Sequence, residues 1–399
     1  MNITIVGGGF GGVKAALELS KNRKNTITLI TDKPDFQYYP ALYSAATGYS
    51  HLESWVPLGE IFAGKMNIHV HIDTVVAIDP AKKNVTGKSG QIYDYDKCIM
   101  ALGVVTTYFG IKGLDTYSYG IKSADEIKRL KHRIYTDIAE HHTLDKHYVV
   151  IGAGPTGVEL AGALGTYLKQ LCHRYGVKDR AMRVTLIEAA PRVLPRMSER
   201  TSQKVTERLK RLGVNVLVGT TVKAEDDDEI FIGNKSIKSH TVIWTSGVMN
   251  HPFYKENSDH FKLAPNGRVE VNQHMLAAKD VYVIGDNAAT PYTGLAQTAL
   301  HDAIFVARNI LRQQKKRKPK EYHAVKPPVV VPVGEGWAAF EWKFIFLYGR
   351  LGSLLRRAAD FVGYSDILPI GQALGVWHAT TIKEDDYFTP SSPDSSASK

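Results

Sequence analysis

Apolar and polar positions outline the same succession of strand, glycine turn and helix twice. The first copy is an apolar run at residues 2–6, a glycine-rich turn at 7–12, a helical pattern from Val13 to Ser20 and a second apolar run at residues 26–30. The second copy occupies residues 148–187. A strand that enters a glycine turn and then a helix opens a βαβ unit. The chain is therefore predicted to contain two nucleotide-binding units.

Further short apolar runs predict the remaining strands of two buried sheets. Such runs are typical of parallel strands that are covered on both faces. Runs of this kind lie at residues 214–218, 241–244 and 281–284. Shorter strand-like pieces lie at residues 75–78, 85–86 and 98–100, and a helical pattern runs from Thr298 to Leu311. The predicted fold class is α/β, with two Rossmann-like dinucleotide-binding domains, the second inserted in the first, plus a C-terminal appendage.

The C-terminal appendage has a different pattern. Residues 337–348 carry an aromatic side chain at every second position from Phe340 to Tyr348, which predicts one strand with an apolar face. From Arg350 to Val362 the apolar residues share one helical face, and Arg356 lies away from it. No apolar run reaches the ~20 residues that span a bilayer. We expect an amphipathic element on a membrane surface, with a dimer interface or a domain cover as the alternatives.

Charge supports an anionic partner for this chain. The formal net charge is +10, the pI is near 9.2, and basic residues concentrate at 312–320 and at 350–357. A nucleic acid or an anionic lipid surface would both suit such a balance. No signature of a nucleic-acid-binding module accompanies the charge, so we expect no nucleic-acid partner and a peripheral membrane one.

The number and spacing of the cysteines argue against redox-dithiol and metal sites, and the first residues of the chain bear on its cellular compartment. Cys98 and Cys172 are the two cysteines, with no CxxC spacing and no cluster of metal-ligand type. A disulfide framework, a redox dithiol and a metal site are therefore not expected. The opening residues, MNITIVGGGFGG, lack the pattern of a secretory signal. We expect the protein in the cytoplasm, on the inner face of the cell membrane.

The first glycine loop has the spacing that binds a dinucleotide pyrophosphate. Gly7, Gly9 and Gly12 form G-x-G-x-x-G between a strand and a helix. Glycine lets the backbone approach the pyrophosphate, and the helix N-terminus supplies N–H donors. An acid at the end of the next strand should bind the ribose. Asp32 is our candidate, although Thr31 could occupy that place instead.

The second glycine loop repeats the pattern with Gly152, Gly154 and Gly157. Glu188 follows the next predicted strand. A carboxylate there can accept hydrogen bonds from both ribose hydroxyls and would repel a 2′-phosphate, which favours NADH over NADPH. Arg192, four residues further on, leaves that preference open.

Together these motifs resemble a known family. The order of VGGGFGG (6–12), ALG (101–103), VIGAGPTGVELAG (150–162), LIEAAPRVLP (186–195) and VIGDNAA (283–289) is similar to the flavin reductases with two dinucleotide-binding domains. Within that superfamily, YYPALYSAATG (38–48), TTYFGIKGL (106–114) and LAQTA (295–299) resemble type II NADH:quinone oxidoreductases. The likeness covers roughly residues 1–310.

The resemblance implies FAD on the first unit and NADH on the second. Its GD motif, Gly285 and Asp286, would contact the FAD ribityl and phosphate groups, and a helix cap is the alternative role of Asp286. Glu159, on the first turn of the second nucleotide helix, would lie near the nicotinamide and flavin. The resemblance also assigns Gly103 to the residues that bind FAD and Gly247 to the residues that bind NADH.

The implied domains follow from the insertion. Residues 1–114 and 266–325 would form the FAD-binding domain, and residues 115–265 the NADH-binding domain. Residues 326–380 would be the docking region for a membrane or another interface. The small, polar residues 381–399 are expected to form a flexible tail.

The acceptor segment departs from the family pattern. The family carries two glutamines where this chain has His301 and Asp302. Gln297 could still orient a group at the flavin, and His301 could donate to a quinone oxygen. The implied activity is transfer of a hydride from NADH to FAD and of electrons to a membrane quinone, without proton pumping. A soluble NAD(P)H flavin reductase that uses oxygen or an electron-carrier protein, or a non-enzymatic NADH sensor, is the alternative, and a homodimer is left open.

Overall fold

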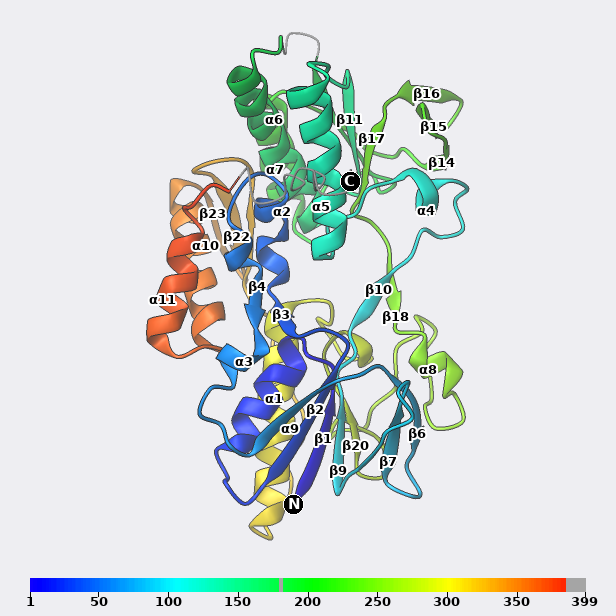
Figure 1. The fold of residues 1–399 in the computed structure, drawn as a ribbon, viewed down its shortest axis with the longest axis vertical. Coiled ribbons are helices and arrows are strands. Elements are labelled where there is room, and N and C mark those ends of the chain that lie inside the picture. The colour runs from blue at the N-terminus through cyan, green and yellow to red at the C-terminus, as the bar shows by residue number, and fades with distance from the viewer. Residues whose placement is uncertain (179–181, 385–399) are drawn as a thin grey trace, which may run out of the picture.

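The computed structural model describes residues 1–178 and 182–384 (Figure 1). Two α/β halves are stacked along the longest axis, with the N-terminal half at the bottom of the view and the second nucleotide-binding unit at the top. A C-terminal appendage covers one flank of both halves. Of the segment 381–399 that was expected to be a flexible tail, residues 385–399 lie outside the described residues.

The lower half is built on a six-stranded sheet. Five of its strands run parallel to one another, and the edge strand β19 (Leu276–Ala278) runs antiparallel to its neighbour. In spatial order the strands are β19 (Leu276–Ala278), β20 (Val281–Val283), β9 (Lys97–Met100), β1 (Asn2–Val6), β2 (Thr26–Thr31) and β5 (Ile68–Ile72). Helices α1 (Phe10–Ser20) and α9 (Ala296–Gln314) pack against each other beside this sheet. Helix α1 begins three residues earlier than the apolar pattern predicts, because it opens within the glycine loop.

The upper half holds a second, fully parallel sheet. Its strands, in order, are β13 (Val214–Leu217), β12 (Arg183–Ile187), β11 (His147–Ile151) and β17 (Thr241–Trp244). The helices of this half are α5 (Ala124–Tyr135), α6 (Pro155–Tyr175) and α7 (Glu199–Arg211). Strands β11 and β17 are buried along most of their length, as the sequence predicts for residues 241–244. The same prediction is wrong for residues 214–218, because only Val214 of the edge strand β13 is buried.

Two chain segments connect the halves and establish the insertion. The chain leaves the lower half through β10 (Val104–Thr106) and returns through β18 (Val248–Asn250), which pair antiparallel. Figure 1 shows the pair running between the two halves. The second unit is therefore inserted in the first, as predicted.

Small sheets and short helices complete the two halves. The strands are β3 (Asp35–Gln37) with β4 (Trp55–Pro57), β6 (Val75–Asp79) with β7 (Asn84–Gly87) and β8 (Ile92–Asp94), and β14 (Val222–Glu225) with β15 (Glu229–Ile232) and β16 (Lys235–Lys238). The short helices are α2 (Leu42–Ala45), α3 (Leu58–Ile61), α4 (Leu114–Tyr117) and α8 (Phe253–Glu256), and a 3₁₀ turn spans His51–Glu53.

The appendage corrects one sequence prediction. It consists of β21 (Val329–Pro332), β22 (Ala338–Trp342), β23 (Ile345–Gly349), α10 (Arg350–Ser365) and α11 (Ile370–Ala379). The predicted single strand at 337–348 is wrong, because residues 338–349 form a hairpin in which Trp342 pairs with Ile345. Lys343 makes the turn with a φ of 51°, and alternation of side chains alone does not reveal such a turn.

Helix α10 is oriented opposite to an ordinary surface helix. Its Leu351, Leu354 and Val362 side chains are 62%, 65% and 59% exposed. The Arg356 side chain, expected with the other basic residues at an anionic surface, is only 11% exposed and points into the protein. In the described ranges 1–178 and 182–384, no helix has the length and apolar character needed to cross a membrane.

Candidate functional site

The first glycine loop has the geometry of a pyrophosphate cradle. The Gly7 N–H donates to the Ile30 carbonyl at 2.8 Å, which ties the loop to the end of β2. A β-carbon at Gly7 would lie 2.2 Å from the Ala101 oxygen, and one at Gly12 would lie 1.8 Å from the Gly7 oxygen. At Gly9 a β-carbon would meet no atom within 4 Å. Two glycines are thus required by the protein's own packing, and the middle one faces open space at the start of α1.

The second loop reproduces this geometry. The Gly152 N–H donates to the Ile187 carbonyl at 2.7 Å. A β-carbon at Gly157 would lie 1.8 Å from the Gly152 oxygen, whereas Gly154 again faces open space just before α6. Both loops therefore fit the pyrophosphate of a dinucleotide at a helix N-terminus.

The two loops also allow the residues that follow β2 and β12 to be compared. Ile30 and Ile187 accept the equivalent hydrogen bonds, so the residue after each is structurally equivalent. Thr31 is thereby the counterpart of Glu188, and Asp32 lies one position further on. A β-carbon at Gly8 would lie 2.6 Å from the Thr31 hydroxyl oxygen, so that side chain lies over the glycine loop. Asp32 is exposed, and its role at the ribose stays a prediction.

Backbone N–H groups fix the Glu188 carboxylate beside the second glycine loop. Its carboxylate accepts hydrogen bonds from the Ala153 N–H at 2.6 Å and the Ala190 N–H at 2.8 Å. Arg192 donates to the carbonyls of Pro195 at 2.7 Å and Met197 at 2.8 Å. The guanidinium that could have attracted a 2′-phosphate is thus engaged by backbone carbonyls.

We predict that Glu188→Gln reduces the preference for NADH. Loss of charge-assisted hydrogen bonds to the ribose should raise the KM for NADH by roughly 5- to 150-fold, the equivalent of about 1–3 kcal/mol, and relieve repulsion of NADPH. Steady-state kinetics with both nucleotides measure the ratio. Glu199→Gln, which changes an exposed acid at the start of α7, is the matched control. Equal use of both nucleotides by the unaltered enzyme would refute the assignment.

The GD motif is supported by a buried network that the sequence did not reveal. The Asp302 carboxylate, fully buried, accepts from the Gly285 N–H at 3.0 Å and from the Tyr322 hydroxyl at 2.6 Å. Asp286 accepts from the Gly294 N–H at 3.0 Å, and burial raises its pKa. The Gly103 N–H donates to Asn287 at 2.8 Å, which joins the ALG and GD motifs. Asp302 therefore positions the turn that carries Gly285 and Asp286.

Glu159 lies in a buried ion network between the two halves and the appendage. Its carboxylate accepts from the Arg356 guanidinium at 3.2 Å. Arg356 also donates to Asp360 at 2.8 Å and to the Pro40 carbonyl at 2.6 Å. Burial raises the pKa of Glu159 to about 7, and the guanidinium opposes that rise. One arginine of α10 thus links the nucleotide helix α6 to the segment before α2.

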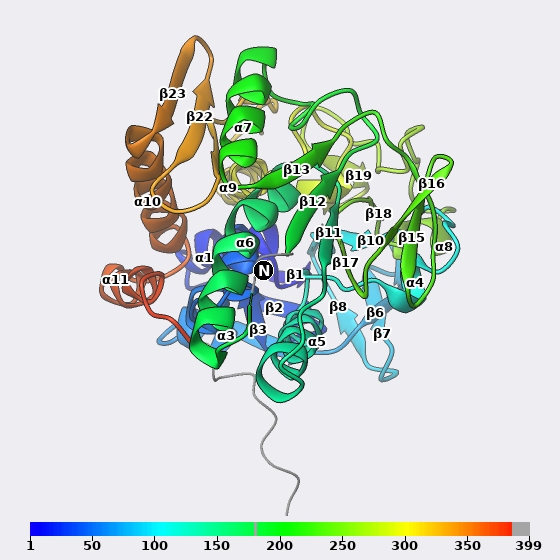
Figure 2. The same cartoon turned by 90° about the horizontal axis from the view of Figure 1, so that it is seen from above.

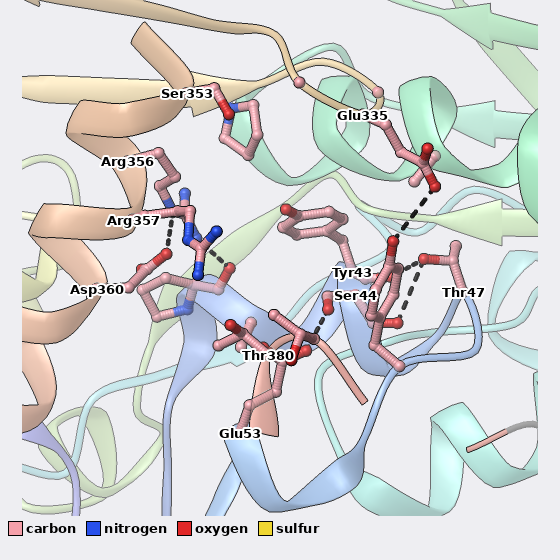
Figure 3. Close-up of a pocket in the computed structure, with 18 of the residues that line it drawn as sticks. Tyr43, Ser44, Thr47, Glu53, Glu335, Ser353, Arg356, Arg357, Asp360 and Thr380 are labelled. Atoms are coloured by element: carbon pink, nitrogen blue, oxygen red, sulfur yellow. Dashed lines mark hydrogen bonds and ion pairs between the residues drawn. The ribbon is translucent and has the colours of Figure 1, made fainter. Parts of the chain in front are cut away.

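A cavity of about 520 Å³ adjoins this network (Figure 3). It lies between α2, α6, the turn before β22, and α10 and α11. Pro40, Tyr43, Glu53, Arg356 and Trp377 are among its lining residues. Figure 3 shows Arg356 reaching Asp360 from α10, with Tyr43 on the opposite side of the space. The cavity provides room for a small molecule beside the Glu159–Arg356 pair.

The predicted acceptor residues lie on α9, away from this cavity's lining. Gln297 is exposed in the first turn of α9. His301, one turn later, packs against the Tyr322 ring with centroids 5.5 Å apart and lies 3.9 Å from Asp302. Gly247, assigned to the NADH set, precedes β18 with a φ of 67° and accepts from Lys122 at 3.3 Å. The roles of Gln297 and His301 at the acceptor stay predictions.

The fold and its similarity to known proteins define the class of this protein. A family model described as pyridine nucleotide-disulphide oxidoreductase matches residues 1–303. The structure of NDH2 from Plasmodium falciparum in complex with NADH superposes with a TM-score of 0.84 at 19% identity, over 98% of this chain and 99% of that chain. Two dinucleotide sites on this fold define a flavoprotein that binds FAD and NADH.

Similarity to curated proteins identifies the family within that class. Over 351 residues the chain is 31% identical to the type II NADH:quinone oxidoreductase NdhA of Mycobacterium tuberculosis, covering 80% of this chain and 74% of the relative. It is 26% identical over 355 residues to a type II NADH:quinone oxidoreductase of Staphylococcus saprophyticus, covering 83% and 87%. The chain belongs to the type II NADH:quinone oxidoreductases.

Proposed function

We propose that this protein is an NADH:quinone oxidoreductase that works on the inner face of the cell membrane, docked through its C-terminal appendage. It is a flavin-dependent NADH dehydrogenase that does not pump protons, and its acceptor is a quinone. The observation that carries the membrane proposal is the orientation of α10, whose apolar face points outward while Arg356 and Asp360 point inward. Outward apolar side chains on a surface helix call for a nonaqueous neighbour.

The exposed apolar side chains extend beyond α10. Figures 1 and 2 show the β22–β23 hairpin, α10 and α11 along one flank of the molecule. Large apolar side chains are exposed on all three elements, namely Trp342, Phe344, Ile345, Leu351, Leu354, Val362, Ile370 and Leu374. Phe344, at the hairpin tip, is 93% exposed. We call this set the apolar flank and propose that its side chains insert into the lipid bilayer.

Basic side chains near the apolar flank favour an anionic lipid surface. Arg350 and Arg357 are exposed on α10 and can each contribute about 1 kcal/mol beside anionic headgroups. Arg356, which the sequence pattern placed with them, is committed to Glu159 and Asp360 and is unavailable for lipid. Attachment should therefore combine apolar insertion with a modest salt-sensitive component.

The chain's own residues prepare both dinucleotides and the acceptor space. When bound, FAD accepts a hydride from NADH and supplies the electrons that reduce the quinone. The glycine loops hold the two pyrophosphates, and Glu188 orients the NADH ribose. Glu159 and Arg356 fix the relative position of α6 and α10 beside the cavity, which we propose admits the quinone head group from the lipid side. Gln297 is proposed to orient a group at the flavin from the start of α9.

Replacing leucines of the apolar flank tests the docking proposal. We expect Leu351→Glu combined with Leu354→Glu to abolish pelleting with anionic liposomes and turnover of a lipophilic quinone in vesicles, because two charges would have to enter lipid. Turnover with a soluble quinone analogue should stay unchanged. Point variants are preferable to a truncation, which would also remove Arg356 and leave Glu159 buried without its partner.

The matched control changes an exposed apolar residue elsewhere. Met66 is 90% exposed before β5, and Met66→Glu should pellet like the parent protein. Parent protein that ignores anionic liposomes at low salt would contradict membrane docking. If light scattering then showed a dimer that the leucine variant loses, the apolar flank would be a contact between two copies of the chain.

A further inference from the structure

Glu53 is a buried acid that the assignments above leave without a role. It ends the 3₁₀ turn His51–Glu53, is 3% exposed and lines the cavity together with Arg356. Its carboxylate accepts a hydrogen bond from the Ser44 hydroxyl of α2, a contact visible in Figure 3. The Tyr364 hydroxyl of α10 donates to its backbone carbonyl at 2.7 Å, which fixes the turn. The side chain is thus held in place at a cavity.

Reduction of a quinone requires a proton that NADH does not carry. The overall reaction is NADH plus one proton plus quinone, giving NAD⁺ plus quinol. NADH delivers two electrons and one proton as a hydride, so the second proton of the quinol must come from water. A buried reaction site therefore needs a group that can hold this proton and pass it on.

We propose that Glu53 is the proton-relay residue that delivers this second proton across the cavity to the reduced quinone. The inference rests on the quinone reductase function proposed above. In each turnover the Glu53 carboxylic acid loses its O–H proton toward the quinone oxygen, by way of the cavity. The resulting carboxylate regains a proton from water at the cavity's outer side, where Tyr49, Glu335 and Lys383 line the space.

The surroundings of Glu53 keep its proton available near neutral pH. Burial raises the pKa of Glu53 to about 8, the Ser44 hydrogen bond opposes that rise, and Asp360 adds to it. The titratable groups that face it are Arg356, Asp360 and Tyr364 on α10, Tyr43 on α2, Tyr38 before α2, Tyr49, and Glu384, which is bound by His51 at 2.7 Å. At pH 7 the group is therefore mostly an acid that can donate.

The position of Glu53 suits a relay toward the Glu159 network. Arg356 and Asp360 influence the pKa of both Glu53 and Glu159, so both acids lie near the same ion pair. Tyr43 lines the cavity, and the charges of both acids raise the pKa of its hydroxyl group. The cavity therefore connects Glu53 with the ion network that we place beside the acceptor.

The test separates the two halves of the catalytic cycle in Glu53→Gln. Stopped-flow measurement of flavin bleaching by NADH under anaerobic conditions should be unchanged, because that half takes no proton from water. Reoxidation by a soluble quinone should slow by at least about tenfold, since general acid catalysis contributes factors of 10²–10⁴. In the parent, this quinone-dependent rate should fall as the pH rises through about 8. That falling limb should disappear in Glu53→Gln and persist in Glu53→Asp.

Two further variants test whether the pH dependence belongs to the Glu53 carboxyl group. Ser44→Ala removes a hydrogen bond that stabilises the charged carboxylate, so the falling limb should move to higher pH. Glu225→Gln is the matched control, because Glu225 is also a buried acid with a pKa raised by burial, to about 7, and a serine partner, Ser118, in the upper half. It should leave both half-reactions and the pH profile unchanged.

The outcomes against the relay are distinct. An unchanged quinone step and pH profile in Glu53→Gln would overturn the relay while leaving the quinone reductase function intact. Equal slowing of both half-reactions would show that Glu53 serves the fold alone. Parent protein that bleaches with NADH but transfers no electrons to any quinone would overturn the proposed function and, with it, the relay.

Discussion

Arg356→Ala is expected to lower the free energy of unfolding by about 3–5 kcal/mol, as when one member of a buried ion pair is removed. The guanidinium contacts Glu159, Asp360 and the Pro40 carbonyl, and two carboxylates would be left facing each other without it. Urea unfolding followed by tryptophan fluorescence measures the loss. Arg350→Ala is the control, because this arginine at the start of α10 is exposed and its removal should cost little.

The loss of unfolding free energy in Arg356→Ala should also depend on pH, and it should grow as the pH rises. The folded pKa of Glu159 is about 7, above its ordinary value of 4.5, so ionisation opposes folding increasingly as the pH rises from about 4.5 to 7. Arg356 lowers that pKa, so its removal extends the loss of stability to higher pH. The destabilisation of Arg356→Ala should therefore be smaller at pH 5 than at pH 8. An equal deficit at both values would contradict a role for the Glu159–Arg356 pair.

The dinucleotide loops could be predicted from the sequence because their determinants are local. Strand, glycine spacing and helix follow one another within a dozen residues, and the structure confirms both units and the insertion of the second. The choice between Thr31 and Asp32 could not be made from the sequence, because it depends on which residue ends β2 in the folded chain. Only the equivalent hydrogen bonds to Ile30 and Ile187 reveal the correspondence of Thr31 with Glu188.

The appendage shows why helical periodicity is not enough. The pattern correctly separates an apolar face of α10 from a charged one, but it does not say which face meets the protein. The pattern places Arg356 among the basic residues 350–357 expected at an anionic surface, whereas its partners Glu159 and Pro40, far away in sequence, hold it inside the protein. The roles of Asp302 and Glu53 were missed because only the folded chain brings partners such as Gly285, Tyr322 and Tyr364 to them.

The largest functional effects are expected from alanine at the middle glycine of each loop. Gly9 and Gly154 have φ angles of −83° and −69°, and a β-carbon at either would meet no atom within 4 Å. Alanine should therefore be compatible with the fold at both positions. The added methyl group would instead occupy the space where the pyrophosphate approaches the backbone.

The two variants should have separate consequences. Gly9→Ala should weaken FAD binding by about 1–3 kcal/mol, or roughly 5- to 150-fold in Kd, and yield paler protein. Gly154→Ala should keep its FAD and weaken NADH binding by a similar factor. Heat release of FAD and titration with NADH measure the two affinities, and Gly59→Ala, also in open space, is the matched control. Because the two loops share one geometry but serve different dinucleotides, loss of FAD from Gly154→Ala, or unaltered FAD affinity in Gly9→Ala, would contradict the assignment of FAD to the first unit and NADH to the second.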